Sequence, residues 1–294
     1  MYRKLQRLLT GLALCLGAAA LIPWAGLVKA QPAVLPGYMR PGVSPGFARP
    51  TFPGGLNTMG SMERVGFSLS PEETRALLQD APEAFGAGVP DLLLAALARA
   101  CWRWTGERAL LVDMESHGRE PIFEEVDLSR TVGWFTSVYP VLLDLRGTPD
   151  DPAAELLQVR DQIRSVPHRG LGYGLLRHLN QSQETRERIR AMPPAEVIFL
   201  YLSQTHQLPA GDARFRMVSE PRGQSVSPRG IKRHLLDAGA RVFEGRLHFS
   251  ISYSRNLYRR STVEGVAEAC RQALSALLER ASAEAGTRAG REGQ

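Results

Sequence analysis

The segment LLVDMESHGREP (110–121) joins an apolar run directly to a cluster of charged residues and one histidine. Glu115 and His117 could exchange protons with a substrate, and Arg119 could hold a carboxylate or a phosphate. Alternate side chains share one side of an extended backbone, so this spacing predicts that these three lie together. The alternative is a structural ion network in which Arg119 pairs with Glu115 or Glu120. The residue types alone do not decide between these two hypotheses.

The charged segment is expected to lie at the end of a strand within a sheet. Short apolar runs predict three buried strands, at 108–115, 138–145 and 196–203. Hydrophobic alternation on both sides of Glu244 and Gly245 predicts a β-hairpin over 240–254. The glycines of PHRGLGYG (167–174) predict a loop.

Helices with clear start signals are expected to pack against these strands. Ser70 and Glu73 form a predicted capping box around Pro71. The strongly apolar segment 89–107 predicts a buried helix that stops near Gly106. Similar signals place two further helix starts near Pro152 and Ser261. Strands alternating with helices predict a layered α/β domain.

The composition is typical of a globular protein, with 44% hydrophobic and 22% charged residues and a net charge of +6. Acids interrupt the arginine-rich segment 184–190, which indicates a solvated helix face and argues against a nucleic-acid partner. The three cysteines lack metal-binding spacing. Cys101 and Cys270 lie in apolar helical patterns and are predicted to be buried free thiols.

The first thirty residues differ from the rest. Three basic residues precede an uncharged run from Leu8 to Val28, and small residues at Val28 and Ala30 are typical of a cleavage site. This pattern predicts a signal peptide at 1–30 and a secreted protein. A run of this length could also remain as a membrane anchor through residues 8–28, and a mis-assigned start is a third explanation.

The rest of the chain divides by composition. Residues 31–61 are rich in proline and glycine and are predicted to be an extended linker. A domain is predicted at 62–283, followed by a disordered tail at 284–294.

Four motifs, in order, resemble those of epimerization domains of nonribosomal peptide synthetases, a branch of the condensation-domain superfamily. ESHGRE (115–120) resembles that family's EGHGRE, and RTVGWFTSVYP (130–140) matches its TVGWFT-x-x-x-P element. PHRGLGYGLLRHL (167–179) matches P-x-x-G-x-G-Y-G, and FLYLSQ (199–204) resembles FNYLGQ. The segment 246–268 also resembles the one that closes these domains. The likeness covers about residues 62–283.

The resemblance implies a single C-terminal lobe of a two-lobed condensation-type (chloramphenicol acetyltransferase-like) α/β fold. The activity it implies is an isomerase reaction at the α-carbon of an aminoacyl or peptidyl thioester. The substrate is carried on the phosphopantetheine of a peptidyl carrier domain, and the protein needs no cofactor of its own. Glu115 would be the catalytic acid/base, and His117 and Arg119 would orient it or line the site.

The resemblance also implies positions for three aromatic residues. Trp134 and Phe135 would pack the wall of the substrate tunnel. Tyr173 would either touch the substrate or fill the core. The family relationship further implies a cytoplasmic location, which conflicts with the signal-like N-terminus.

Two small departures and one large one separate this sequence from the family pattern. Ser116 replaces a glycine, which would add strain if that position had a positive φ. Leu200 and Ser203 replace an asparagine and a glycine. The family's second catalytic group lies in HHxxxDG, and no His-His pair occurs in this sequence.

Because the histidine lobe is missing, the lone lobe is predicted to be inactive unless a separate N-terminal lobe supplies it. One alternative is a non-catalytic protein that docks a carrier domain or a synthetase module. The other is a secreted or anchored protein of unrelated role.

Overall fold

The computed structural model describes residues 50–120, 126–203, 223 and 225–292. Its centre is a six-stranded sheet with the strand order β1-β6-β5-β4-β2-β3. The strands are β1 (Met62–Ser68), β2 (Ala109–Ser116), β3 (Ser137–Asp144), β4 (Val197–Leu202), β5 (Leu236–Phe243) and β6 (Arg246–Ser254). The predicted α/β class is therefore confirmed.

The sheet is mixed. β4 pairs in parallel with both β2 and β5, and the remaining neighbours are antiparallel. The carboxyl ends of β2, β4 and β5 therefore lie side by side at the same end of the strands, where α/β proteins commonly place their sites.

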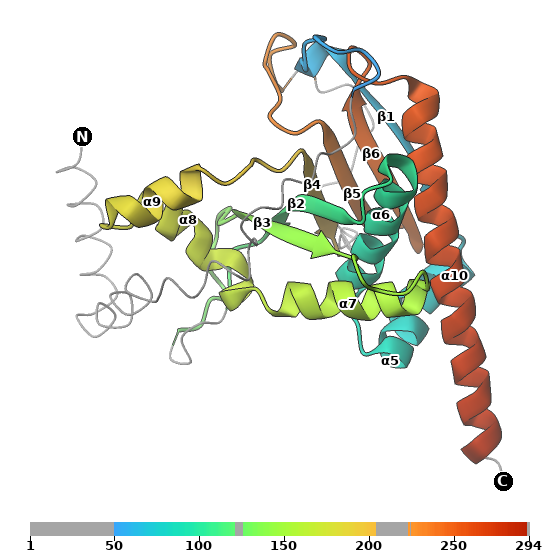
Figure 1. Cartoon of the computed structure of the whole chain (residues 1–294). Coiled ribbons are helices and arrows are strands. Elements are labelled where there is room, and N and C mark those ends of the chain that lie inside the picture. The colour runs from blue at the N-terminus through green and yellow to red at the C-terminus, as the bar shows by residue number, and fades with distance from the viewer. Residues whose placement is uncertain (1–49, 121–125, 204–222, 224, 293–294) are drawn as a thin grey trace, which may run out of the picture.

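Most of the helices cover one face of this sheet. The helices are α4 (Pro71–Arg75), the π-helical turn η4 (Ala76–Asp80), α5 (Ala81–Phe85), α6 (Val89–Thr105), α7 (Pro152–Arg164), α8 (Leu171–His178), α9 (Gln183–Arg190) and α10 (Arg260–Glu292). Of these, α8 packs beside β3 and α9 packs on α8, away from the strands (Figure 1). Figure 1 shows the long α10 and the shorter α6 side by side along the sheet. One continuous apolar core fills the space between these helices and the sheet. We call the opposite side of the sheet the open face.

Local sequence explains the helix boundaries. Ser70 accepts a hydrogen bond from the backbone N–H of Glu73, and the Glu73 carboxylate accepts one from the backbone N–H of Ser70, which confirms the predicted capping box. α6 ends at Gly106, whose positive φ of 82° permits the left-handed cap. The predicted hairpin forms β5 and β6, with Glu244 and Gly245 both at positive φ in its turn.

One local prediction was wrong, and one strand was not predicted. The segment 167–174 forms a short 3₁₀ helix, Pro167–Gly170, and the first half of α8. Tertiary packing overrides its glycines, because Tyr173 and Leu176 are buried in the core. α10 begins at Arg260, one residue before Ser261, so the helix start predicted near Ser261 is confirmed. β1 was not anticipated.

The predicted linker and tail also differ from the structure where residues are described. The backbone N–H of Phe52 donates to the carbonyl of Leu257 at 3.0 Å, and Thr58 forms a β-bridge with Ile231. Residues 50–61 are thus tied to the domain. At the other end, α10 continues to Glu292, beyond the predicted limit at 283.

The predicted signal peptide or anchor at 1–30 lies outside the described residues and stays a prediction. Among the described residues, no single helix is long and apolar enough to cross a membrane. The two segments Pro71–Phe85 and Val89–Thr105, taken together, are long and apolar enough for a membrane span, but the chain bends by 92° between them.

The two cysteines of the described region are buried and free, as predicted. Complete burial raises the pKa of the Cys101 thiol to about 12, because the charged thiolate is disfavoured in an apolar interior. Burial also raises the pKa of Cys270 well above its ordinary value.

Candidate functional site

Glu115 lies near the end of β2, at the edge where the parallel strands terminate. Its neighbour on β3 is Val138, and the β2–β4 register continued by one residue places Leu200 on its other side. Leu110, Val112 and Met114 belong to the core, so alternation points Glu115 toward the open face. Its side chain is half-buried, and within the described residues it has no hydrogen-bond or ion-pair partner. Such a carboxylate is available to accept a proton from a bound molecule.

The chain turns immediately after Glu115. β2 ends at Ser116, and Gly118 has a positive φ of 66°. A Cβ atom on Gly118 would lie 1.7 Å from the carbonyl oxygen of Phe135, so only glycine fits this turn. The predicted alignment of Glu115, His117 and Arg119 on one extended face is therefore wrong. Ser116 has no positive φ, so the serine adds no strain of that kind.

Glu120 organises the turn, a role that the sequence interpretation missed. Its carboxylate is only 7% exposed. It accepts a hydrogen bond from Ser116 Oγ at 3.2 Å and lies 3.7 Å from His117 Nε2. Arg169 approaches from another segment, with its Nε 3.5 Å from the carboxylate. The structural ion network thus exists, but its acid is Glu120 and its arginine is Arg169.

Arg119 connects the turn to the second motif. Its guanidinium donates a hydrogen bond to the carbonyl of Gly133 and lies 5.1 Å from the ring of Phe135. Its backbone N–H donates to His117 Nδ1 at 2.9 Å. Arg119 pairs with neither Glu115 nor Glu120, so its contacts hold the loop in place.

Arg169 belongs to an unusual backbone. His168 and Arg169 both have positive φ, at 47° and 48°. Non-glycine residues in this region cost of order 1 kcal/mol each. Gly170 follows, and a Cβ there would lie 2.0 Å from the ring of Tyr139. The segment 167–174 therefore packs closely against Tyr139 of β3 with a strained backbone, and this placement brings Arg169 to Glu120.

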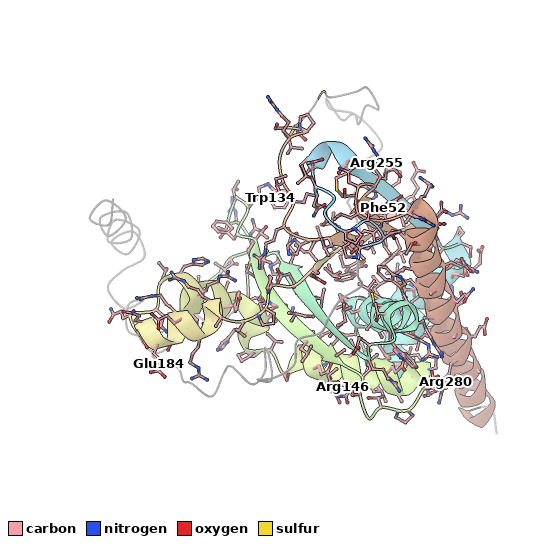
Figure 2. The ribbon with its side chains drawn as sticks, turned by 45° about the horizontal axis from the view of Figure 1, so that its top comes forward. Phe52, Trp134, Arg146, Glu184, Arg255 and Arg280 are labelled. Carbon is pink, nitrogen blue, oxygen red and sulfur yellow. The ribbon has the colours of Figure 1, made fainter. Side chains whose placement is uncertain are left out.

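Trp134 and Phe135 lie on the surface of the described part of the chain. Trp134 is 92% exposed and Phe135 is 47% exposed, and Val132 beside them is 94% exposed. Figure 2 shows Trp134 well apart from Arg146 and Arg280. This apolar loop is available for contact with another protein surface.

Tyr173 lies inside the core. It is 7% exposed, and its hydroxyl accepts a hydrogen bond from Arg177 Nη1 at 3.0 Å on the same helix. Tyr173 therefore packs in the core between α8 and the sheet, and contact with a substrate stays a prediction.

A second polar pair lies on the open face of β2, two residues before Glu115. Asp113 is 4% exposed, and its carboxylate lies 2.8 Å from His234 Nε2, with Arg233 at 3.7 Å. The backbone carbonyl of His234 accepts a hydrogen bond from Asn57 Nδ2 at 2.8 Å. This pair fixes the segment before β5 across β4. In the described ranges, no group of three or more potential metal ligands converges.

Known proteins resemble this chain over most of its described length. The model of the Condensation domain family matches residues 57–288. A linear gramicidin synthase of Brevibacillus parabrevis contains a stretch that is 44% identical over 226 residues, which is 76% of this chain and 3% of that protein. Surfactin synthase subunit 1 of Bacillus subtilis is 36% identical over 234 residues, 79% of this chain and 6% of that protein. This chain therefore spans a small fraction of these relatives.

Solved structures show a similar likeness. The epimerization domain from the third module of tyrocidine synthetase B superposes with a TM-score of 0.76 and 28% identity, over 90% of this chain and 60% of that one. A condensation domain from the enacyloxin polyketide synthase has a TM-score of 0.55 at 15% identity, over 79% of this chain and 44% of that one, which shows the fold alone. The resemblance drawn from the four motifs is confirmed, and the single-lobe fold with it.

Proposed function

This chain belongs to the condensation-domain family, and from that premise we propose that it is the C-terminal lobe of an epimerization domain. In this proposal a second lobe carries the histidine group, supplied by another chain or by further sequence. The complete domain inverts the α-carbon of an aminoacyl or peptidyl thioester that a carrier domain presents on phosphopantetheine. Alone, the lobe is inactive.

The observation that carries the proposal is the placement of Glu115. This carboxylate is half-buried at the open face, has no partner among the described residues, and lies at the edge where β2, β4 and β5 end. The neighbouring polar residues are already occupied. Glu120 holds Ser116 and Arg169, and Asp113 holds His234. Glu115 is therefore the acid of this motif that is available to a substrate.

The proposed reaction is a proton exchange. The Cα–H bond of the thioester substrate breaks, the proton passes to the Glu115 carboxylate, and the electron pair delocalises into the thioester carbonyl as an enolate. A protonated group on the opposite lobe then delivers a proton to the other side of Cα. A matched pair of acid and base on opposite sides is required for inversion, and this lobe contributes one member.

The test is exchange of the α-proton into deuterated water with an aminoacyl carrier domain as substrate. We expect exchange when this chain is combined with a histidine-bearing N-terminal lobe, and none with either lobe alone. Glu115→Gln should lower the exchange rate at least about 100-fold, because the proton acceptor is lost. Glu107→Gln is the matched control, since Glu107 is exposed before the opposite end of β2. No exchange by the reconstituted pair would overturn the proposal.

A second candidate function, docking without catalysis, is favoured by the exposed apolar loop. Val132 and Trp134 expose more than nine tenths of their surface. A docking role predicts that a carrier domain binds this chain and that binding survives Glu115→Gln. Binding that is undetectable at high micromolar concentration, measured by calorimetry, would exclude it.

A further inference from the structure

One end of the sheet adjoins segments that carry basic residues and no acids. The amino ends of β1 and β5 meet the carboxyl end of β6 there, since Met62 pairs with Ser254 and Leu236 pairs with Tyr253. Three segments flank these strand ends, at residues 50–61, 225–235 and 255–261. We call the surface that these three segments form the basic end.

Backbone hydrogen bonds hold the three segments of the basic end together. The N–H of Arg255 donates to the carbonyl of Ser61 at 3.0 Å, and the N–H of Lys232 donates to the carbonyl of Asn57 at 2.8 Å. Figure 2 shows Phe52 and Arg255 close to each other at this end of the molecule. The segments are far apart in sequence but form one continuous surface.

The charge of the basic end is of one sign. Its segments contain six arginines and lysines and no aspartate or glutamate. Their summed charge of +6 equals the net charge of the whole chain, so bases and acids balance over the remaining sequence. Three of the six bases pair with acids outside the segments. The others, Arg229, Arg255 and Arg259, are exposed and make no ion pair within the described residues, so they are available to an anionic partner.

Apolar side chains project between these arginines. Leu56, Val226 and Ile231 each expose more than half of their surface, and Phe52 exposes 42%. The guanidinium of Arg259 lies 5.8 Å from the ring of Phe52, so cationic and apolar groups are interleaved. Such a surface suits the interface of an anionic membrane, where apolar groups enter the headgroup region and guanidinium groups bind lipid phosphates.

The sequence that precedes Pro50 favours a lipid surface over an acidic protein as the partner. The uncharged run at 8–28 is long enough to enter a bilayer, and both fates predicted for it, export and anchoring, bring the chain to a membrane. Only 21 residues, 29–49, separate this run from Pro50. A chain of that length covers about 25 Å when coiled and at most about 70 Å when fully extended. The chain then enters the described domain at the basic end.

We propose that the basic end is a docking surface for an anionic membrane. Its exposed apolar side chains enter the headgroup region, and Arg229, Arg255 and Arg259 bind lipid phosphates. β5 begins at the basic end and runs parallel to β2, so Glu115 lies toward the other end of the strands and stays open to a substrate. The inference goes beyond the proposed function and does not depend on it.

The experiment measures amide hydrogen exchange by mass spectrometry in the full chain mixed with lipid vesicles. A local readout is needed, because the run at 8–28 could itself bind any vesicle. With vesicles of phosphatidylglycerol and phosphatidylcholine, we expect exchange in the three segments of the basic end to slow at least about fivefold. With phosphatidylcholine alone, we expect no change in these segments.

The arginines are tested by Arg255→Ala combined with Arg259→Ala. Each basic residue near an anionic surface contributes about fivefold in affinity, so the lipid concentration for half-maximal protection should rise about 25-fold. Arg188→Ala combined with Arg190→Ala is the matched control, since both arginines are exposed on α9. Figure 2 shows Glu184, near the start of α9, far from the basic end. This control should bind like the wild type.

The apolar contribution is tested by Leu56→Ser combined with Ile231→Ser. Losing two side chains that enter the headgroup region should raise the half-maximal lipid concentration about tenfold. Leu179→Ser is the control, because Leu179 is also exposed but lies at the end of α8. Unchanged circular dichroism in every variant shows that the fold is intact.

Four outcomes would overturn the proposal. Equal losses in the two double-arginine variants would show non-specific charge attraction. Equal protection of the basic end by neutral vesicles would remove the role of the anionic lipid, and no protection by either kind of vesicle would remove the surface itself. Polyglutamate is the last probe. If it protects the same segments as strongly as the anionic vesicles do, the surface binds an acidic polypeptide and the lipid assignment is wrong.

Discussion

Successive residues of β2 face two different surroundings. Val112 and Met114 point into the apolar core beneath the helices, whereas Asp113 and Glu115 point to the open face. The same alternation in β6 places Phe249 in the core and the next residue, Ser250, on the open face. The covered face is filled by one large apolar core, whereas the open face combines polar and charged side chains with a small apolar cluster that includes Leu111 and Leu142. Most of the apolar stabilisation therefore lies on one face, and Glu115 lies on the other.

The largest expected contrast concerns a matched pair of leucines. Leu143 on β3 is fully buried, and Leu202 on β4 is 43% exposed. Leu143→Ala should lower the free energy of unfolding by about 2–5 kcal/mol, because it removes buried methylenes and leaves a cavity. Leu202→Ala should change it by less than about 0.5 kcal/mol. Urea unfolding followed by circular dichroism measures both, and equal losses would contradict the contrast.

The two glutamates of the segment 115–120 test a second contrast, between a paired and an unpaired acid. Glu120→Gln removes the charge that holds Arg169 and His117, so we expect a loss of about 1–2 kcal/mol and faster amide exchange in residues 116–120. Glu115→Gln should alter stability by less than about 0.5 kcal/mol, because Glu115 has no partner among the described residues. If Glu115→Gln proved the more destabilising, the assignment of their roles would be reversed.

The covered face should also respond to alkaline pH. Burial raises the pKa of Cys101 from 9.0 to about 12, so the unfolded chain releases this proton first. The stabilising contribution is fully present below pH 9 and is lost as pH rises toward 12. At pH 10 the loss is about 1.4 kcal/mol for this thiol. Comparing unfolding at about pH 8 and pH 10, Cys101→Ala should show a correspondingly smaller decrease than the wild type.

The smallest expected effect is that of Trp134→Ala. With 92% of its surface exposed, this side chain should contribute less than about 0.5 kcal/mol to the free energy of unfolding. Trp104→Ala is the matched control, because Trp104 packs against the core with its ring 5.8 Å from that of Tyr258, and its loss should cost about 3 kcal/mol. A large loss from Trp134→Ala in thermal unfolding would show that its loop packs on the domain.

Local patterns predicted most of the elements of the covered face. The capping box at Ser70, the apolar helix that ends at Gly106 and the hairpin around Gly245 all depend on residues close together in sequence. β1 was missed because glycine and polar residues interrupt the alternation of an edge strand. The helical form of 171–178 was missed because burial of Tyr173 is a long-range effect.

The candidate site was only partly predictable. The motif identified Glu115, but the extended conformation assumed beyond it ended at Gly118, whose own presence was a signal for a turn. The role of Glu120 depends on Arg169, which arrives from a distant segment.

The pairing of β1 with β6 has a consequence for how the chain folds. Glu63 accepts a hydrogen bond from Tyr253, 190 residues further along the sequence. During synthesis β1 is among the first strands of the domain to emerge, yet the strand that completes its ladder emerges almost last. Contacts of such long range slow folding, and a strand waiting for its partner is exposed to wrong pairings. The edge of the sheet formed by β1 is therefore the region whose formation depends most on the whole domain having been made.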